Sequence, residues 1–261
     1  MGVIISYFNA KGGVAKTTSC VNIGAIIASA EKKVLIVDID SQASATACVG
    51  INEEKLELTI FNLLKNKKVT KEDIKKVIIH TKFDNLDIIP SNIGLSTADL
   101  ELAGFINREM ILKNILEKIK SDYDYIFIDC PPNLALMSIN SLSASDYIII
   151  PVSPNFLSVK GIKHLVNAYN LIKKGVNPKL EIMGVLITMY DSRKNIAKDI
   201  RKQLAEVFND EIFDTVIRMN SQIEYSQNNQ TPLVYFNQKC TAFDDYCKIS
   251  QDIINFIEGE E

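Results

Sequence analysis

The chain has 261 residues, of which 47% are hydrophobic and 23% charged, and this composition is typical of a folded globular protein and excludes a disordered one. Its formal net charge is -3, so nucleic acid could be bound only through a local basic patch, and no apolar run approaches the ~18 residues of a membrane-spanning helix. The N-terminus has no basic start and no cleavage site, which excludes a secretory signal, and five scattered cysteines favour reduced thiols over disulfides or a zinc site.

Short runs rich in Ile, Val and Tyr alternate along the chain with longer segments of helical period. The runs carry almost no charge, which is typical of strands buried on both faces of a parallel sheet. The alternation predicts an α/β fold, with a mostly parallel twisted sheet and helices on both of its faces. We expect strands at residues 3–8, 34–37, 86–89, 125–128, 147–152, 182–188 and 213–217, and helices at 17–30, 108–120, 159–174 and 195–208.

We expect residues 1–261 to form one domain, because no Pro/Gly-rich linker, repeat or low-complexity tract divides the chain. Residues 52–82 are rich in Lys and Glu. We expect them to form a solvated helical insertion within that domain.

The segment after the first expected strand reads NAKGGVAKTT at residues 9–18 and leads directly into an expected helix. Small residues in such a loop allow backbone N–H groups to point at phosphate oxygens, and the helix N-terminus adds partial positive charge. We expect Lys16 to reach the terminal phosphates and the Thr17 hydroxyl to ligate Mg²⁺. The sequence therefore predicts a P-loop NTPase, with a nucleotide held by Lys11, Gly12, Gly13, Val14, Ala15, Lys16, Thr17 and Thr18.

Three aspartates follow expected strands. Asp129 ends the apolar run IFID, which places its carboxylate at the carboxyl edge of the sheet, where it can hold Mg²⁺ through a water molecule. Asp38 and Asp40 end the second expected strand, and side-chain alternation places both on the same side of it.

Four segments, in the same order along the chain, resemble the ParA/MinD family of ATPases. KGGVAKTT is similar to the family's deviant Walker A motif, KGGVGKTT, and VLIVDIDSQASAT to its DxDPQ segment. YDYIFIDCPPNL resembles the Walker B strand with its following switch, and TMYDSR resembles a strand-end segment of partition proteins. The resemblance covers nearly the whole chain and is strongest to the short, Soj-like ParA proteins of chromosome and plasmid partition. It implies an ATPase that uses ATP and Mg²⁺.

The resemblance also implies roles for single residues. The residue that matches Asp40 orients or activates the attacking water, and the one that matches Asp38 supports the metal shell, so the expected metal site is Thr17, Asp38 and Asp129. Lys11 would cross a two-fold interface and contact the nucleotide of the partner subunit in an ATP-bound homodimer. The expected catalytic residues are therefore Lys11, Lys16 and Asp40.

Ala10 and Ala15 stand where the usual G-x-x-x-x-G-K-[ST] pattern has its outer glycines. If the backbone at Ala15 requires a positive φ, the alanine costs on the order of 1 kcal/mol and distorts the loop. If φ is negative, the methyl group only presses on the loop. Both alternatives are compatible with the sequence, and either allows slow or impaired hydrolysis.

Residues 192–202 hold five basic residues against one acidic residue. On a helix that begins near residue 195, Lys198, Arg201 and Lys202 share one face. By composition alone such a face is more often solvated surface, but the resemblance implies that ATP-bound dimers bind double-stranded DNA nonspecifically in this part of the chain. The candidate DNA contacts are Arg193, Lys194, Lys198, Arg201, Lys202 and, more weakly, Arg218; the family often has a further basic residue where this chain has Gln222.

The resemblance further implies a ParB-type centromere-binding partner that stimulates hydrolysis, and a cytoplasmic, nucleoid-associated protein that segregates plasmid or chromosomal DNA. Two alternatives remain open. The two alanines leave room for a nucleotide-dependent scaffold or regulator with little hydrolysis, and the family leaves room for a MinD-like positioning factor. Residues 252–261 are acidic, so anionic lipid would repel them, and we expect no membrane partner.

Overall fold

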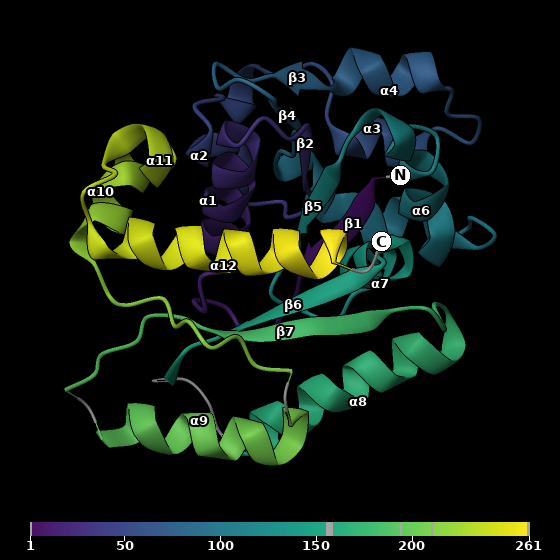
Figure 1. Cartoon of the computed structure of the whole chain (residues 1–261). Coiled ribbons are helices and arrows are strands. Elements are labelled where there is room, and N and C mark those ends of the chain that lie inside the picture. Colours follow the sequence, from purple (N-terminus) through teal and green to yellow (C-terminus); the bar gives the residue numbers. More distant parts are fainter. Residues whose placement is uncertain (1, 155–158, 194, 210, 260–261) are drawn as a thin grey trace.

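The computed structural model describes residues 2–154, 159–193, 195–209 and 211–259. Within these residues the strands form one seven-stranded sheet in the order β3-β4-β2-β5-β1-β6-β7 (Figure 1). Neighbouring strands pair in parallel except β3 and β4, which are antiparallel. The predicted α/β fold is confirmed. The strands are β1 Val3–Tyr7, β2 Val34–Asp38, β3 Ile79–His80, β4 Leu86–Ile89, β5 Tyr125–Asp129, β6 Tyr147–Val152 and β7 Glu181–Ile187.

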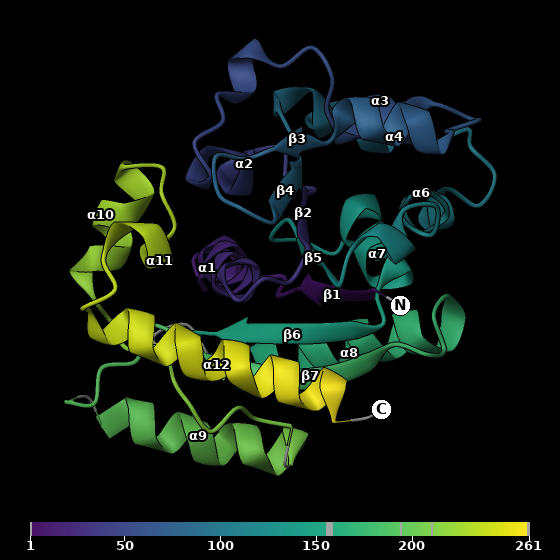
Figure 2. The same ribbon diagram turned by 45° about the horizontal axis from the view of Figure 1, so that its top comes forward.

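Helices cover both faces of the sheet, as Figure 2 shows. Side chains alternate along each strand, so that Val34 and Ile36 of β2 pack on one face and Leu35 and Val37 on the other. The first face carries α1 Lys16–Ser29, α2 Ser44–Cys48, α10 Ser221–Asn228, α11 Leu233–Phe236 and α12 Thr241–Glu258. The second carries α3 Ile60–Lys65, α4 Lys71–Val77, α5 Ala98–Glu101, α6 Ile111–Leu116, α7 Leu136–Ala144, α8 Val159–Gly175 and α9 Asn195–Phe208. Short 3-10 turns lie at Glu53–Lys55, Ile93–Thr97, Arg108–Met110 and Lys120–Asp122.

Helix α1 is buried along nearly its whole length. Apart from Lys16 and Asn22, its residues are apolar or small on all sides, which is typical of a helix that packs between two layers. The sheet lies on one side of α1 and α12 on the other. This packing fixes the N-terminus of α1, and hence the loop between β1 and α1, against the rest of the molecule.

The expected strand at 213–217 is wrong. The structure has isolated bridges there, Val185 to Ile212 and Tyr190 to Arg218, with a bend between them. Phe213 explains the interruption, because its ring lies over Gly184 so closely that a Cβ on Gly184 would come within 2.6 Å of it. The segment therefore follows β7 without forming a continuous ladder.

The expectation that residues 52–82 form a solvated insertion is also wrong. Ile60, Leu64 and Ile74 of α3 and α4 are fully buried in the core of the second face, and the segment ends in β3. The charged residues that dominated the composition lie on the outer sides of α3 and α4, in the 3-10 turn Glu53–Lys55 and in the connecting loops. The expected helix at 108–120 is shorter than predicted, because α6 ends at Leu116 between two 3-10 turns.

Candidate functional site

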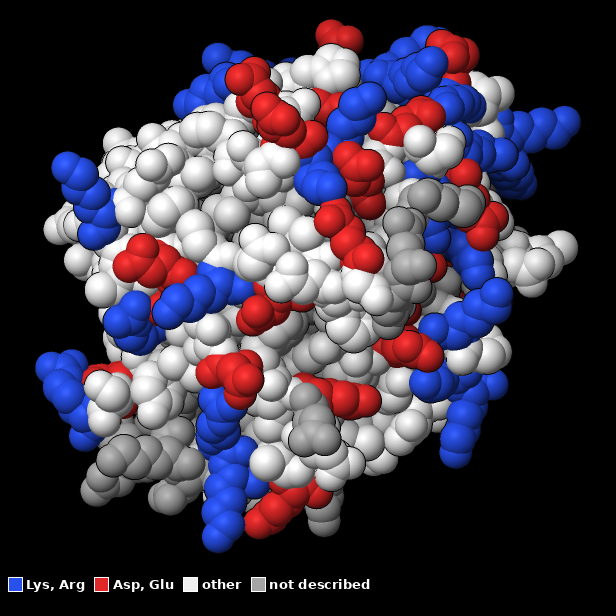
Figure 3. Space-filling view, viewed as in Figure 1, with Lys and Arg blue, Asp and Glu red and all other residues white. Residues whose placement is uncertain are grey.

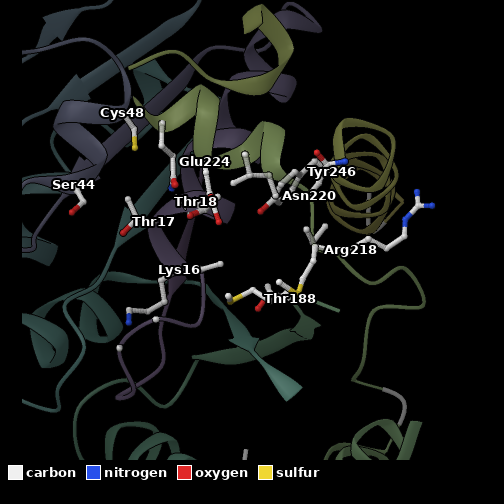
Figure 4. A pocket seen from close by; sticks show the side chains of 18 of the residues that line it. Lys16, Thr17, Thr18, Ser44, Cys48, Thr188, Arg218, Asn220, Glu224 and Tyr246 are labelled. Atoms are coloured by element: carbon white, nitrogen blue, oxygen red, sulfur yellow. Dashed lines mark hydrogen bonds between the residues drawn. The ribbon is translucent and has the colours of Figure 1, made fainter. Parts of the chain in front are cut away.

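A cleft of about 620 Å³ opens at the carboxyl edge of the sheet, beside the ends of β1, β2 and β5 (Figure 4). One wall is the loop between β1 and α1, and the opposite wall is the segment 217–224, which leads into α10. Open α/β sheets bind their ligands at this edge. The predicted site residues that line the cleft are Gly12, Gly13, Ala15, Lys16, Thr17, Thr18, Asp40 and Arg218.

Two predicted loop residues, Lys11 and Val14, line a neighbouring cavity of about 350 Å³ between the loop and helices α8 and α9. Asn9 anchors this side of the loop, because its Oδ1 accepts a hydrogen bond from the Lys11 N–H at 3.0 Å. Its Nδ2 donates to the Pro151 carbonyl at the end of β6. Lys11 thus stands at the outer side of the loop rather than in the cleft that holds Lys16.

The loop backbone turns through two left-handed residues, Gly13 at φ 72° and Ala15 at φ 60°. Glycine adopts this conformation freely, whereas alanine does so at a cost of about 1–2 kcal/mol. The structure therefore has the positive-φ alternative for Ala15. Ala10 is not among the left-handed residues of the described chain, so its methyl group carries no such cost.

Lys16 lies buried at the first position of α1. Its Nζ donates a hydrogen bond to the Lys11 carbonyl across the loop at 3.0 Å. Burial lowers the pKa of Lys16, although the nearby Asp129 carboxylate acts in the opposite direction. The ammonium group is thus held over the loop by a backbone acceptor that a phosphate oxygen could replace.

Thr17 and Asp129 meet as the sequence predicted. The Thr17 hydroxyl donates to Asp129 Oδ2 at 2.6 Å. The other oxygen, Oδ1, is buried and has no hydrogen-bond partner within the described chain. Burial raises the pKa of Asp129, and the neighbouring Asp38 raises it further. A cation would relieve both effects, so this pair fits a magnesium ion with a partly retained water shell.

Asp38 pairs with Asp129 in the register of β2 and β5. Its Oδ2 accepts hydrogen bonds from the Thr46 N–H and hydroxyl, both at 2.8 Å, and its Oδ1 accepts one from the Asp40 N–H at 3.2 Å. Burial raises the pKa of Asp38 to about 6. With both oxygens engaged, Asp38 positions the turn that follows β2 and fits the supporting role better than direct metal ligation.

Asp40 differs from the other two aspartates because it is partly exposed and lines the cleft. Its Oδ1 accepts a hydrogen bond from the Gln42 N–H at 3.0 Å, which fixes the carboxylate in a turn. No cluster of three His, Cys, Asp or Glu residues that could hold a metal occurs in the described part of the chain. A metal at this site would therefore depend on Thr17, Asp129, water and phosphate oxygens together.

The wall opposite the phosphate loop was not predicted from the sequence. It combines apolar side chains with a few polar ones, and it is tied to α1: Gln227 donates to the Thr18 hydroxyl at 2.8 Å, and the Tyr246 and Ser19 hydroxyls lie 3.4 Å apart. No local motif marks these residues, because they come from three separate segments. They are Thr188, Met189, Ile217, Met219, Asn220, Ser221, Ile223, Glu224, Gln227 and Tyr246.

The predicted DNA-binding surface carries less net positive charge than its sequence indicates, because its arginines form ion pairs with aspartates. Arg193 is paired with Asp191 at 2.8 Å, Arg201 with Asp214 at 2.8 Å, and Arg218 with the buried Asp245 at 2.6 Å. Arg218 lines the cleft only with its inner part, and its guanidinium turns away towards α12 (Figure 4).

The lysines of this surface are less fully described. Lys202 is exposed, Lys194 lies outside the described residues, and the side chain of Lys198 lies outside them as well. On the face seen in Figure 3, basic and acidic side chains are interspersed, and no large area of one sign stands out.

The cysteines of the described chain are unpaired, and burial raises the pKa of the Cys20, Cys48 and Cys130 thiols. Cys48 lines the cleft beside Ser44. Among the described helices, none has the length and apolar character needed to cross a membrane.

Comparison with known proteins adds to this geometry. Residues 2–182 match a family model described as an AAA domain. The chain is 38% identical over 253 residues to sporulation initiation inhibitor protein Soj of Bacillus subtilis, covering 97% of this chain and 98% of Soj. It is 33% identical to chromosome partitioning protein ParA of Myxococcus xanthus, covering 97% and 88% of the two chains.

A solved structure has the same fold over nearly its whole length. Cobyrinic acid a,c-diamide synthase from Mycobacterium smegmatis, with bound ADP and magnesium, superposes with a TM-score of 0.86 at 26% sequence identity. The superposition covers 100% of this chain and 97% of the synthase.

Proposed function

The chain belongs to the ParA/MinD family of P-loop ATPases, close to Soj, and we propose that it is a DNA-partition ATPase that works as an ATP-dependent dimer. It hydrolyses ATP and uses Mg²⁺. The partition step, the dimer and the DNA contact are the proposal. The single observation that carries it is the place of Lys11, which lines the outer side of its own phosphate loop and not the cleft that holds Lys16, Thr17 and Asp40.

In this proposal the triphosphate lies along the loop. The loop N–H groups and the Lys16 ammonium neutralise its charge, and Lys16 exchanges the Lys11 carbonyl for a phosphate oxygen. Thr17 and Asp129 would hold Mg²⁺, which neutralises charge on the transferring phosphoryl group, and Asp38 fixes the turn behind them. Asp40 orients the attacking water from the open side of the cleft.

Lys11 completes the site of a second copy in this proposal. It lines the outer side of its own loop, next to α8 and α9, rather than the cleft. A lysine in that place can contact a nucleotide bound by a facing subunit and stabilise the charge that develops during transfer. ATP binding and dimerisation then strengthen each other by the same factor.

DNA binding would occur through the charges of 193–202 that remain after internal pairing. Arg193, Arg201 and Arg218 each form an ion pair with an aspartate. We therefore expect DNA binding that is weak, salt-sensitive and independent of sequence. A ParB-type partner would stimulate hydrolysis and so release the DNA. These partners imply a cytoplasmic, nucleoid-associated protein.

The test is DNA retention by an Asp40→Ala variant, with ATP or ADP, across a series of salt concentrations. We expect retention with ATP alone, a decline as salt rises, and loss when Lys11→Ala is added. Lys239→Ala, at an exposed lysine far along the chain, is the matched control and should leave retention unchanged.

The same experiment can overturn the proposal. Retention that is equal with ADP, or unaffected by Lys11→Ala, would exclude the ATP-dependent dimer. If ATP binds and DNA is not retained at any salt concentration, a nucleotide-dependent scaffold becomes the better interpretation. The left-handed Ala15 favours that alternative, because strain in the loop slows closure around the phosphates.

A further inference from the structure

A further cavity, of about 480 Å³, opens on the second face of the sheet, between the end of α3, the loop before α6 and α6 itself. We call it the α3–α6 groove. Helices α3 and α6 contact each other on the side of the molecule that lies away from α10 (Figure 2). None of the described residues that line the groove also lines the nucleotide cleft. The groove is therefore a separate feature of the surface.

The floor of the groove is apolar. Leu64 and Ile115 are buried in the core of the second face, and Phe105 and Ile111 pack against that core while they remain partly exposed. Ile106 also lines the groove and is 91% exposed, the highest fraction among the exposed large hydrophobic residues of the described chain. Covering such a side chain removes apolar surface from water, which favours association. The groove thus offers an apolar surface to a ligand.

The turn after Ile106 keeps this side chain at the surface. Asn107 has φ 53°, a left-handed conformation that asparagine tolerates better than most residues. The Asn107 carbonyl accepts a hydrogen bond from the Met110 N–H at 2.9 Å. The start of α6 is tied to α7, because the buried Asn140 side chain accepts from the Leu112 N–H at 3.0 Å. The exposure of Ile106 is therefore part of a defined backbone geometry.

The polar part of the groove is basic. Lys67, Lys68 and Lys118 line it, whereas no Asp or Glu among the described residues does. Within the described ranges none of these three lysines takes part in an ion pair. The Lys67 ammonium lies over the Phe105 ring, 5.2 Å from the ring centroid, so positive charge and apolar surface adjoin. Three like charges in one groove favour an anionic ligand.

This combination suits an acidic peptide segment that also carries apolar side chains. Its carboxylates would pair with the lysines, and its apolar side chains would cover Ile106 and Phe105, as in grooves that bind one face of an amphipathic helix. A second copy of the chain fits less well, because a symmetric contact would bring two sets of lysines together. Nucleic acid would supply phosphates for the lysines, but its charged backbone would leave Ile106 without an apolar partner.

We propose that the α3–α6 groove is a docking site for an acidic amphipathic segment of a partner protein. Ile106 and Phe105 are its apolar anchors, and Lys67, Lys68 and Lys118 select the charge of the segment and orient it. The proposal goes beyond the partition function, because the groove shares no described lining residue with the nucleotide cleft.

The test begins with a phage-displayed library of random peptides, selected on the unmodified chain without nucleotide. Phage that bind a variant carrying both Ile106→Asp and Lys67→Glu are removed first, so the remaining peptides are those whose binding needs the groove. We expect them to carry more Asp and Glu than Lys and Arg, together with apolar residues at helical spacing. Enrichment of neutral or basic peptides, or no enrichment at all, would overturn the proposal.

A selected peptide, synthesised with a fluorescent label, then measures the contribution of single side chains by fluorescence anisotropy. We expect Ile106→Ala to weaken its binding at least about tenfold and Lys67→Glu at least about fivefold. Leu100→Ala and Lys239→Glu are the matched controls, because Leu100 is 82% exposed, Lys239 is exposed, and neither lines the groove. Thermal unfolding checks that each variant is folded. Losses as large in the controls would place the peptide elsewhere and contradict the proposal.

Two measurements without nucleotide identify the other occupants. Sedimentation that shows self-association of the unmodified chain, lost in Ile106→Ala, would make the occupant a second copy. Labelled double-stranded DNA whose retention falls with Lys67→Glu and is unchanged by Lys239→Glu would make the groove a phosphate-binding surface. Either result overturns the proposal. Neither depends on the ATP-dependent dimer, so failure of the docking site and failure of the proposed function remain distinguishable.

Discussion

The phosphate loop and the basic segment 192–202 were both conspicuous in the sequence, yet the structure treats them differently. In the phosphate loop the contacts agree with the prediction from the sequence. Lys16 donates a hydrogen bond to the loop backbone, and Thr17 donates one to Asp129. In the basic segment, Arg193 and Arg201 form ion pairs with Asp191 and Asp214, which neutralise much of the positive charge there. Loop geometry depends on consecutive residues, whereas the charge of a surface depends on every element that packs beside it.

Substitution of the lysine in the phosphate loop should change activity most. Lys16→Ala removes the cation that neutralises the terminal phosphates, so we expect ATP turnover to fall by about 10²-fold or more. Phosphate release measured at saturating ATP checks this, with Lys202→Ala as the matched control in the basic segment. Equal effects of the two substitutions would contradict the difference drawn between the two regions.

The second effect is a pH dependence of folding stability that comes from Asp38, a buried aspartate behind the phosphate loop. The pKa of Asp38 is raised from 3.8 to about 6, so folding favours its protonated form. Stability from this group is full below pH 3.8 and is lost as pH rises through about 6. The unfolding free energy of the unmodified chain, relative to that of Asp38→Asn, should therefore fall by an amount on the order of 2 kcal/mol between pH 4 and pH 7.

Urea unfolding of the nucleotide-free protein at a series of pH values measures this change. Asp99→Asn, at an exposed aspartate of α5, is the control for the loss of one surface carboxylate. A constant difference between Asp38→Asn and the unmodified chain would mean that Asp38 is as readily ionised in the folded chain as in the unfolded one.

The third effect concerns the basic segment. Asp214→Asn removes the negative charge opposite Arg201, whose guanidinium donates to Asp214 Oδ1 at 2.8 Å and to the Asp214 carbonyl at 3.0 Å. If the segment contacts DNA, retention should rise severalfold, and the salt dependence should steepen by about one phosphate contact. Lys202→Glu should act in the opposite direction. DNA retention that responds to neither substitution would place the DNA contact elsewhere on the surface.

The smallest effect tests the left-handed alanine. Ala15→Gly removes the strain at φ 60°, and although glycine adds freedom to the unfolded chain, we expect a net gain of about 0.5–1 kcal/mol in unfolding free energy. Ala10→Gly is the internal control, because residue 10 is not left-handed and gains nothing from glycine. A gain at residue 10 equal to that at residue 15 would remove strain as the explanation.

Much of the phosphate end could be predicted from the sequence, because its parts are contiguous. The strand–loop–helix order identified Lys16 and Thr17, and the apolar run before Asp129 placed that carboxylate at the edge of the sheet. The sequence left open whether φ at Ala15 is positive or negative, and only the backbone angle of 60° in the structure distinguishes the two alternatives. The strand expected at 213–217 failed because the fit of Phe213 on Gly184 is a contact between distant residues.

Periodicity and neighbouring residues were enough to predict the alternation of strands and helices, the phosphate loop and the acids at the strand ends. The opposite wall of the cleft and the pairing of Arg218 with Asp245 became apparent only in the folded chain. Those features join segments that lie far apart in the chain, and local propensity carries no information about which distant side chains will meet.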